Sequence, residues 1–214
     1  VNNDGYSDVL VGSPGTSLNF AGEGSIHLFM GSISGTSATA DWSYHCQQLG
    51  CDLGVSVNAA GNVNGDAYDD FVVGAIRYDS NHVYPGGAYD EGAALVFHGS
   101  MTGPSVAPDL VLQPGVVASQ AGFAVAGIGD VNGDGYGDIF TAAYTSSAGA
   151  LNGGKGYVYS GQDGSLIRTM TGTMAGIVLG VDALAIGDVN GDGSIDYMLT
   201  GSGIAHVIAG TPME

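Results

Sequence analysis

Residues 129–138 read GDVNGDGYGD, and this stretch decides the fold of the chain. Counting Asp130 as position 1, oxygen-bearing side chains occupy positions 1, 3, 5 and 9. A calcium ion takes about six to eight oxygen ligands, and alternate residues of a tightly curled loop can point toward one ion. The stretch therefore predicts a calcium-binding turn, with side-chain ligands Asp130, Asn132, Asp134 and Asp138 and a carbonyl ligand from Tyr136.

The composition of this turn supports a bound cation. Gly135 at position 6 permits a sharp bend that a side chain would hinder. Without an ion, three crowded carboxylates would repel one another and raise each other's pKa. With a dication, the same crowding supplies binding energy.

The pattern recurs four times along the chain. The closing aspartates are Asp8, Asp70, Asp138 and Asp196, at spacings of 62, 68 and 58 residues. Such regular self-similarity is typical of repeat architectures. The further ligands that it predicts are Asn2, Asp4, Tyr6 and Asp8 in the first loop, Asn62, Asn64, Asp66, Tyr68 and Asp70 in the second, and Asp188, Asn190, Asp192, Ser194 and Asp196 in the last.

The four loops match the pattern to different degrees. The last is complete, whereas the second has Asn62 at position 1 and Ala67 at the glycine position, so we expect weaker binding there. In the first loop, position 1 would precede Val1. The sequence therefore predicts three to four bound Ca²⁺ ions. Eleven of the 21 acidic residues lie in these loops, and four ions would move the formal charge from −18 to −10.

Each loop belongs to a longer repeated unit. Apolar stretches such as LGVSVNAAG, AGFAVAGIG and LGVDALAIG precede three of the loops, and stretches such as GEGSIHLFMGS and DEGAALVFHGS follow them. Four short strands per unit describe a propeller blade. We therefore predict an all-β fold of about three and a half blades, each of four antiparallel strands, with repeats at approximately residues 1–52, 53–120, 121–178 and 179–214.

An EF-hand or a dockerin begins with the same acidic spacing. Those loops need a bidentate acid at position 12, at the start of an exiting helix. Position 12 here is Val11, Val73, Thr141 and Leu199. The residues that follow the loops are short, often β-branched runs, which favour strands. Metal-free turns rich in Asp and Asn remain the alternative, but four recurrences at one spacing argue against it.

The charge and the apolar content of the chain exclude several classes of protein. The chain has 21 acidic and three basic residues, so it lacks the clustered cations that bind nucleic acids or anionic membranes. Hydrophobic residues make up 44% of the chain, which predicts a packed core and not a disordered acidic tail. No apolar run reaches the roughly 18 residues of a membrane span. We expect no nucleic-acid partner and no direct membrane insertion.

Two cysteines, Cys46 and Cys51, lie close together before the second repeat. In an extracellular setting a small disulfide loop, worth about 2 kcal/mol, is expected, and two buried free thiols are the alternative. His45 lies beside them, but without a second cysteine pair or paired histidines it does not predict a zinc site.

No catalytic motif stands out in the sequence. There is no G-x-S-x-G elbow, and GALNGGKG at residues 149–156 ends in glycine where a phosphate-binding loop needs Ser or Thr. His27, His98 and His206 recur in or beside the third strand of their units, as packing or surface residues. We therefore expect a non-catalytic protein.

These elements resemble the FG-GAP repeats of integrin α-subunit head domains and of many secreted bacterial proteins. The resemblance rests on LG or AGF, then GDVNGDGYGD, then VGSPG or VGAIR, and covers essentially all 214 residues. It implies the blades of an extracellular calcium-bearing β-propeller, usually with seven blades. It also implies metal ligands on the four loops. Asn62, Ala67, LG in place of FG, and TAAYT at residues 141–145 depart from the family pattern.

The implied function is adhesion to, or recognition of, a protein or carbohydrate ligand. The scaffold of a secreted polysaccharide-degrading enzyme and a structural subunit of a surface assembly are the alternatives. Long loops opposite the acidic turns are the candidate ligand surface, and the loop at residues 76–92 carries amphipathic rings suited to sugars or proteins. Its candidate ligand residues are Tyr78, His82, Tyr84 and Tyr89.

Three and a half blades leave open sheet edges, which invite pairing with other chains. We expect a fragment of a longer propeller, with self-association of two copies through these edges as the alternative.

Overall fold

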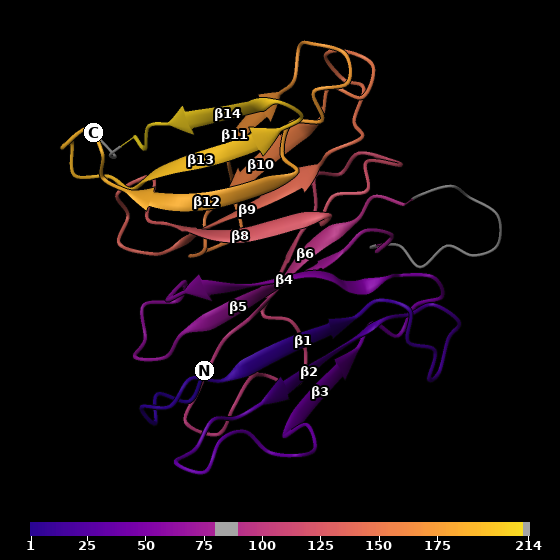
Figure 1. The fold of residues 1–214 in the computed structure, drawn as a ribbon, viewed down its shortest axis with the longest axis vertical. Coiled ribbons are helices and arrows are strands. Elements are labelled where there is room, and N and C mark those ends of the chain that lie inside the picture. Colours follow the sequence, from indigo (N-terminus) through magenta and orange to yellow (C-terminus); the bar gives the residue numbers. More distant parts are fainter. Residues whose placement is uncertain (80–89, 212–214) are drawn as a thin grey trace.

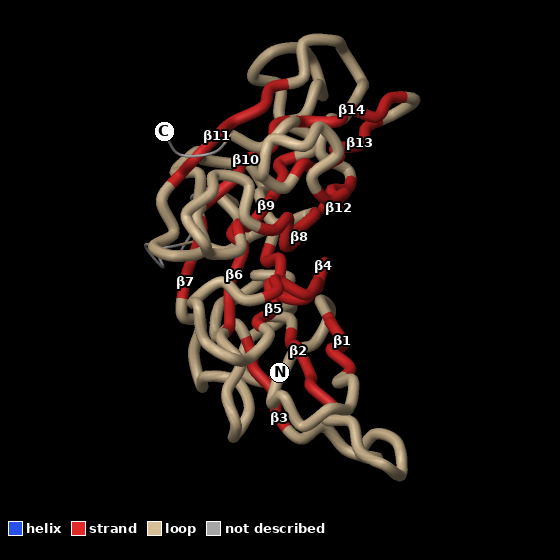
Figure 2. Tube along the Cα trace, turned by 90° about the vertical axis from the view of Figure 1, so that its left-hand side faces the viewer, coloured by secondary structure: helices blue, strands red, loops and turns tan. Residues whose placement is uncertain are grey.

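Fourteen β-strands and no helix make up the regular structure of residues 1–79 and 90–211, which are the residues that the computed structural model describes (Figure 1, Figure 2). The predicted all-β class is confirmed. The strands are β1 (Val9–Ser13), β2 (Ser25–Phe29), β3 (Trp42–His45), β4 (Leu53–Gly61), β5 (Asp70–Ala75), β6 (Ala93–Phe97), β7 (Leu110–Leu112), β8 (Ala124–Gly129), β9 (Asp138–Ala143), β10 (Lys155–Tyr159), β11 (Leu166–Thr171), β12 (Asp182–Gly187), β13 (Asp196–Gly201) and β14 (Ile204–Ile208).

The strands form four antiparallel sheets of propeller-blade type. Their orders are β1-β2-β3, β4-β5-β6-β7, β8-β9-β10-β11 and β12-β13-β14. They follow one another in an open row from the bottom to the top of Figure 1. The second and third sheets have the four strands predicted for a blade. Within the described residues the first sheet has no counterpart of β4, and the last has no counterpart of β7 or β11.

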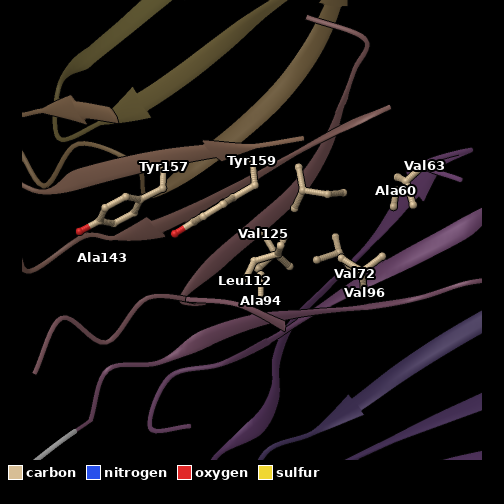
Figure 3. Packing of buried hydrophobic residues seen from close by; sticks show 11 residues of the cluster. Ala60, Val63, Val72, Ala94, Val96, Leu112, Val125, Ala143, Tyr157 and Tyr159 are labelled. Atoms are coloured by element: carbon tan, nitrogen blue, oxygen red, sulfur yellow. The ribbon is translucent and has the colours of Figure 1, made fainter. Parts of the chain in front are cut away.

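Three hydrophobic cores lie between successive sheets. Because side chains alternate along a strand, Val72 of β5 faces the third sheet while Val73 faces the first. Both faces of β5 and β9 are covered, so all their residues are buried. The core between the second and third sheets, shown in Figure 3, consists of Ala60, Val63, Val72, Ala94, Val96, Leu112, Val125, Ile139, Ala143, Tyr157 and Tyr159.

Aromatic rings fill the core between the first two sheets. Trp42 lies edge-on to Phe97 with ring centroids 5.4 Å apart, and Phe71 stacks on Phe97 at 5.3 Å. Such contacts add about 0.5 to 1.5 kcal/mol each beyond the area that they bury. A disulfide joins the buried Cys46 and Cys51 at the edge of this core.

Glycines set the close contact between neighbouring sheets. A Cβ on Gly74 would lie 1.8 Å from the carbonyl oxygen of Gly122, and one on Gly12 would lie 2.1 Å from that of Gly54. Gly54 and Gly122 also have φ values of 92° and 100°, which a side chain would strain. The repeated LG or AG element of one unit therefore meets the glycine of the strand that follows the acidic turn in the preceding unit.

A register shift precedes three of the acidic turns. The antiparallel pairing slips between Ala59 and Gly61, between Gly127 and Gly129, and between Ala185 and Gly187. An extra residue of this kind bends a strand and increases its twist. The shift thus turns the chain into each acidic loop in the same way. In the described part of the chain, no helix has the length and apolar character of a membrane span.

Candidate metal loops

The acidic turns occupy the same place in each sheet. Residues 62–69 join β4 to β5, residues 130–137 join β8 to β9, and residues 188–195 join β12 to β13, while residues 1–8 lead into β1. Because equivalent strands run in the same direction in all four sheets, the turns line one side of the row (Figure 1).

The residues at positions 3, 5 and 7 make the same hydrogen bonds in all four loops. In the third loop, the Asn132 side-chain amide donates to Oδ2 of Asp134 at 2.9 Å, and the Tyr136 backbone N–H donates to Oδ1 of Asp134 at 2.9 Å. These are local Asx turns, which the sequence spacing alone can specify. The equivalent bonds join Asn2, Asp4 and Tyr6, then Asn64, Asp66 and Tyr68, and then Asn190, Asp192 and Ser194.

The carboxylate at position 1 accepts the backbone N–H groups of positions 4 to 6 of the same loop. Oδ1 of Asp130 accepts the N–H groups of Gly133 at 2.6 Å and Asp134 at 3.1 Å, and Oδ2 accepts that of Gly135 at 2.9 Å. Asp188 makes the same three bonds in the last loop, and these backbone bonds, the one from Gly193 foremost, lower its pKa. In the second loop Asn62 keeps the bond from the Gly65 N–H at 2.8 Å but brings no charge.

The closing aspartates of the last three loops are buried beneath them. Oδ2 of Asp70 accepts the N–H of Val63 at 2.8 Å, and Oδ1 accepts that of Gly99 at 2.8 Å. Asp196 makes the equivalent bonds to Val189 and Gly210, both at 2.9 Å. Position 9 therefore fixes the acidic turn to the end of the third strand of the same unit.

Asp138 keeps this arrangement in part. Its Oδ2 accepts the Val131 N–H at 2.9 Å, whereas its buried Oδ1 has no hydrogen bond of normal geometry within residues 1–79 and 90–211. The Gly161 N–H, which is equivalent to those of Gly99 and Gly210, still acts on this carboxylate and lowers its pKa. Burial and the charges of Asp134 and Asp130 outweigh the two backbone N–H groups and raise the pKa of Asp138 to about 7.

The basic side chains of the chain contact other groups. Arg77 pairs with Asp52 at 2.8 Å, Lys155 lies over the Tyr157 ring, and Arg168 donates to the carbonyl of Ala209 at 3.1 Å. The negative charge of the third loop is thus not balanced by a side-chain cation.

The donor set of the loops fits Ca²⁺, since it consists of carboxylate, amide and carbonyl oxygens, and the Asp138 Oδ1 has no hydrogen bond of normal geometry. Across the described ranges, no three Asp, Glu, His or Cys side chains stand as a ready ligand group. The reason is visible in the third and last loops, where the carboxylate of position 1 is turned onto loop amides. The ligand assignment stays a prediction.

A glycine after the third strand is a site residue that sequence reasoning missed. A Cβ on Gly161 would lie 1.9 Å from the carbonyl oxygen of Gly137, and one on Gly99 would lie 2.4 Å from that of Asp69. Gly31 and Gly210 have the same close contact with the first and last loops. The signal was the glycine that recurs in MGS, HGS, SGQ and AGT.

The candidate ligand loop is only partly described. Tyr78 is half-buried against the core between the first two sheets, and burial raises the pKa of its hydroxyl. His82, Tyr84 and Tyr89 lie outside the described residues. His27 lies on β2 and His206 on β14, and His98 follows β6.

Comparison with known proteins identifies relatives. No protein-family model matches the chain. It is 30% identical over 164 residues to integrin alpha-PS2 of Drosophila melanogaster, covering 68% of this chain and 11% of the relative. It is 32% identical over 155 residues to integrin alpha-IIb of Mus musculus, covering 69% of this chain and 14% of the relative.

A third relative has an enzyme name. Phosphatidylinositol-glycan-specific phospholipase D of Homo sapiens is 33% identical over 107 residues, covering 49% of this chain and 12% of the relative. The chain thus spans only a small part of each of these proteins. The matches to the integrin α subunits cover about two thirds of this chain, and the structure has the sheets that the repeats predict. The chain therefore belongs to the integrin α-type FG-GAP repeat family.

Proposed function

We propose that the chain is a calcium-stabilised, non-catalytic extracellular module for adhesion or recognition. The observation that carries the calcium assignment is the third loop, where the charges of Asp134 and Asp130 and burial together raise the pKa of Asp138, whose Oδ1 has no hydrogen bond of normal geometry. The integrin α relatives support the adhesion assignment. The disulfide supports an oxidising, extracellular location.

Bound Ca²⁺ would neutralise the negative charge of each loop and hold together the two strands that the loop joins. Asp130, Asn132, Asp134 and Asp138, with the carbonyl of Tyr136, would hold the ion in the third loop. The hydrogen bonds around Asp134 fix the curl of the loop before an ion binds, whereas Asp130, which accepts loop amides, would have to turn to the ion. At an ion concentration of about 100 times Kd, one site stabilises the fold by about 2.7 kcal/mol.

The candidate recognition surface lies on the side opposite the acidic turns. There the loops between β1 and β2 and between β9 and β10 present exposed apolar side chains, with 67% of Leu18 and 72% of Leu151 accessible. Exposed apolar side chains among polar ones suit a protein or glycan surface. Because the chain spans only 8 to 15% of the integrin relatives, the ligand of those proteins is not transferred to it.

Two measurements test this proposal separately. Calorimetric titration of the metal-stripped protein with CaCl₂ should give saturable binding, with the Asp134→Ala and Asp192→Ala variants each losing one site. A panel of matrix proteins and polysaccharides should then give binding without turnover. Absence of any calcium uptake would overturn the metal assignment, and depolymerisation of a panel member would overturn the non-catalytic assignment.

A scaffold within an enzyme is the second candidate, and the phospholipase D relative favours it. In that case the chemistry would lie in residues outside the matched region. Assays of polysaccharide cleavage and phosphodiester cleavage by the chain decide between the two candidates. Native mass spectrometry tests the self-association that the open sheet edges would permit.

A further inference from the structure

Backbone hydrogen bonds join the acidic loops of neighbouring sheets. The N–H of Gly137, at position 8 of the third loop, donates to the carbonyl of Asn62, at position 1 of the second loop, at 3.0 Å. The N–H of Ile195, at position 8 of the last loop, donates to the carbonyl of Asp130, at position 1 of the third loop, at 3.1 Å. The same two positions are therefore joined across two successive pairs of sheets.

The donor in each of these bonds belongs to a peptide group that also carries a predicted metal ligand. The carbonyl of Tyr136 is the predicted ligand at position 7 of the third loop, and the N–H of Gly137 is the other half of the same peptide group. Peptide groups are planar and trans, so the carbonyl and the N–H point in opposite directions. The Tyr136 carbonyl thus points away from Asn62 of the second loop. Ser194 and Ile195 form the equivalent peptide group in the last loop.

The acceptor in each bond belongs to the residue at position 1. The side chain of Asp130 accepts amides of its own loop and would have to turn to an ion, while its carbonyl is held by Ile195 of the last loop. The bond therefore fixes the backbone from which this ligand would turn. One loop thus holds the first ligand residue of the loop before it.

Side chains at positions 7 and 8 add to the contact between loops. A Cβ on Gly65, in the second loop, would lie 2.9 Å from the ring of Tyr136. A Cβ on Gly129, which precedes the third loop, would lie 3.0 Å from the side chain of Ile195. Closely packed contacts transmit strain, so movement of one loop acts on its neighbour.

We propose that the acidic loops are coupled in series, so that filling the last loop with Ca²⁺ raises the calcium affinity of the third, and filling the third raises that of the second. This inference rests on the proposed calcium binding. A cation held by a peptide carbonyl polarises that peptide group and strengthens the hydrogen bond that its N–H donates. The strengthened bond holds position 1 of the preceding loop in place for an ion of its own. Because coupling between binding sites is reciprocal, each filled loop also favours the one after it.

Charge alone predicts coupling of the opposite sign. Asp188, Asp192 and Asp196 give the last loop a formal charge of −3, which a bound Ca²⁺ would change to −1. An Asp192→Ala variant that binds no ion there would leave this loop at −2. The third loop would then have a more negative neighbour, which attracts its ion more strongly. A loss of affinity in the third loop of this variant would therefore report the hydrogen-bonded coupling and not the charge.

Calcium titration of ¹⁵N-labelled, metal-stripped protein, followed by NMR in about 0.15 M salt, tests the coupling. The Gly135 amide reports on the third loop, because its acceptor Asp130 would turn to the ion. In Asp192→Ala, the Kd of the third loop should rise at least about fivefold, which is the lower end of typical couplings between sites. An unchanged or smaller Kd would overturn the proposal. Wild-type protein that takes up no calcium would overturn calcium binding itself, and the coupling with it.

A measurement on the wild type remains decisive if Asp192→Ala does not fold. The amide proton of Ile195 should shift downfield as the last loop fills, because the Ser194 carbonyl of the same peptide group then holds an ion. An Ile195 amide proton that stays in place would overturn the proposal.

The first loop provides the matched control. Within residues 1–79 and 90–211, no backbone hydrogen bond joins the first loop to the second. Asp4→Ala also removes a carboxylate at position 5, but it should leave the Kd of the second loop within about twofold of the wild-type value. A loss of affinity as large as that in the third loop of Asp192→Ala would overturn the proposal, since loops without the bond would then respond alike.

Discussion

The carboxylate of Asp138 makes the stability of the metal-free protein depend on pH. Its pKa rises from 3.8 to about 7 in the fold, mainly through burial. Below about pH 3 the group is protonated in both the folded and unfolded states and contributes nothing. As pH rises, the unfolded state ionises first, so the folded state loses stability until it too is ionised above about pH 7. A pKa that rises from 3.8 to about 7 lowers the free energy of unfolding by about 4 kcal/mol at high pH.

The variant Asp138→Asn removes this charge while an oxygen remains to accept the Val131 N–H. Integrating the titration between pH 4.5 and 8 gives a difference of about 3 kcal/mol. In calcium-free buffer, the unfolding free energy of Asp138→Asn minus that of the wild type should therefore rise by about 3 kcal/mol over this range. Urea unfolding followed by circular dichroism measures it at each pH.

An exposed carboxylate provides the control. Hydrogen bonds from Ser165 lower the pKa of Asp163, so Asp163→Asn should show no increase of this sign. In saturating calcium at pH 8 the Asp138 effect should reverse, because the wild type then gains an ion that Asp138→Asn binds poorly. A calcium-free difference that changes by less than about 0.5 kcal/mol across the pH range would refute the reasoning.

Three further predictions concern stability. Chelation of calcium should lower Tm by well over about 10 °C if three or four sites each contribute about 2.7 kcal/mol, and an unchanged melt in EDTA would contradict the metal assignment. Gly161→Ala should destabilise the fold by more than about 3 kcal/mol, because its Cβ would lie 1.9 Å from a backbone oxygen, whereas Gly15→Ala, with open space around it, should cost less than about 1 kcal/mol by urea unfolding. Cys46→Ser with Cys51→Ser should cost about 2 kcal/mol, and a non-reducing melt that matches the wild type would show that the disulfide adds nothing.

The candidate site was predictable from sequence where it is local. Asn132 bonds Asp134 two residues away, and Asp130 bonds amides three to five residues away, so the spacing of the residues specifies the curl of the loop. The hydrogen bond that joins position 9 to the end of the third strand was not predictable from the spacing. Asp70 bonds Gly99, which lies 29 residues further along the chain, and only the third strand's return brings the two together.

The sequence by itself determined the repeat, the order of strands in each sheet and the position of the acidic turns, because alternation, turn residues and Asx spacing act over a few residues. Only the tertiary structure decided which glycines meet between sheets and which backbone amides face the buried aspartates. Those contacts join residues of different strands and loops, and their energies depend on burial, which no local pattern records.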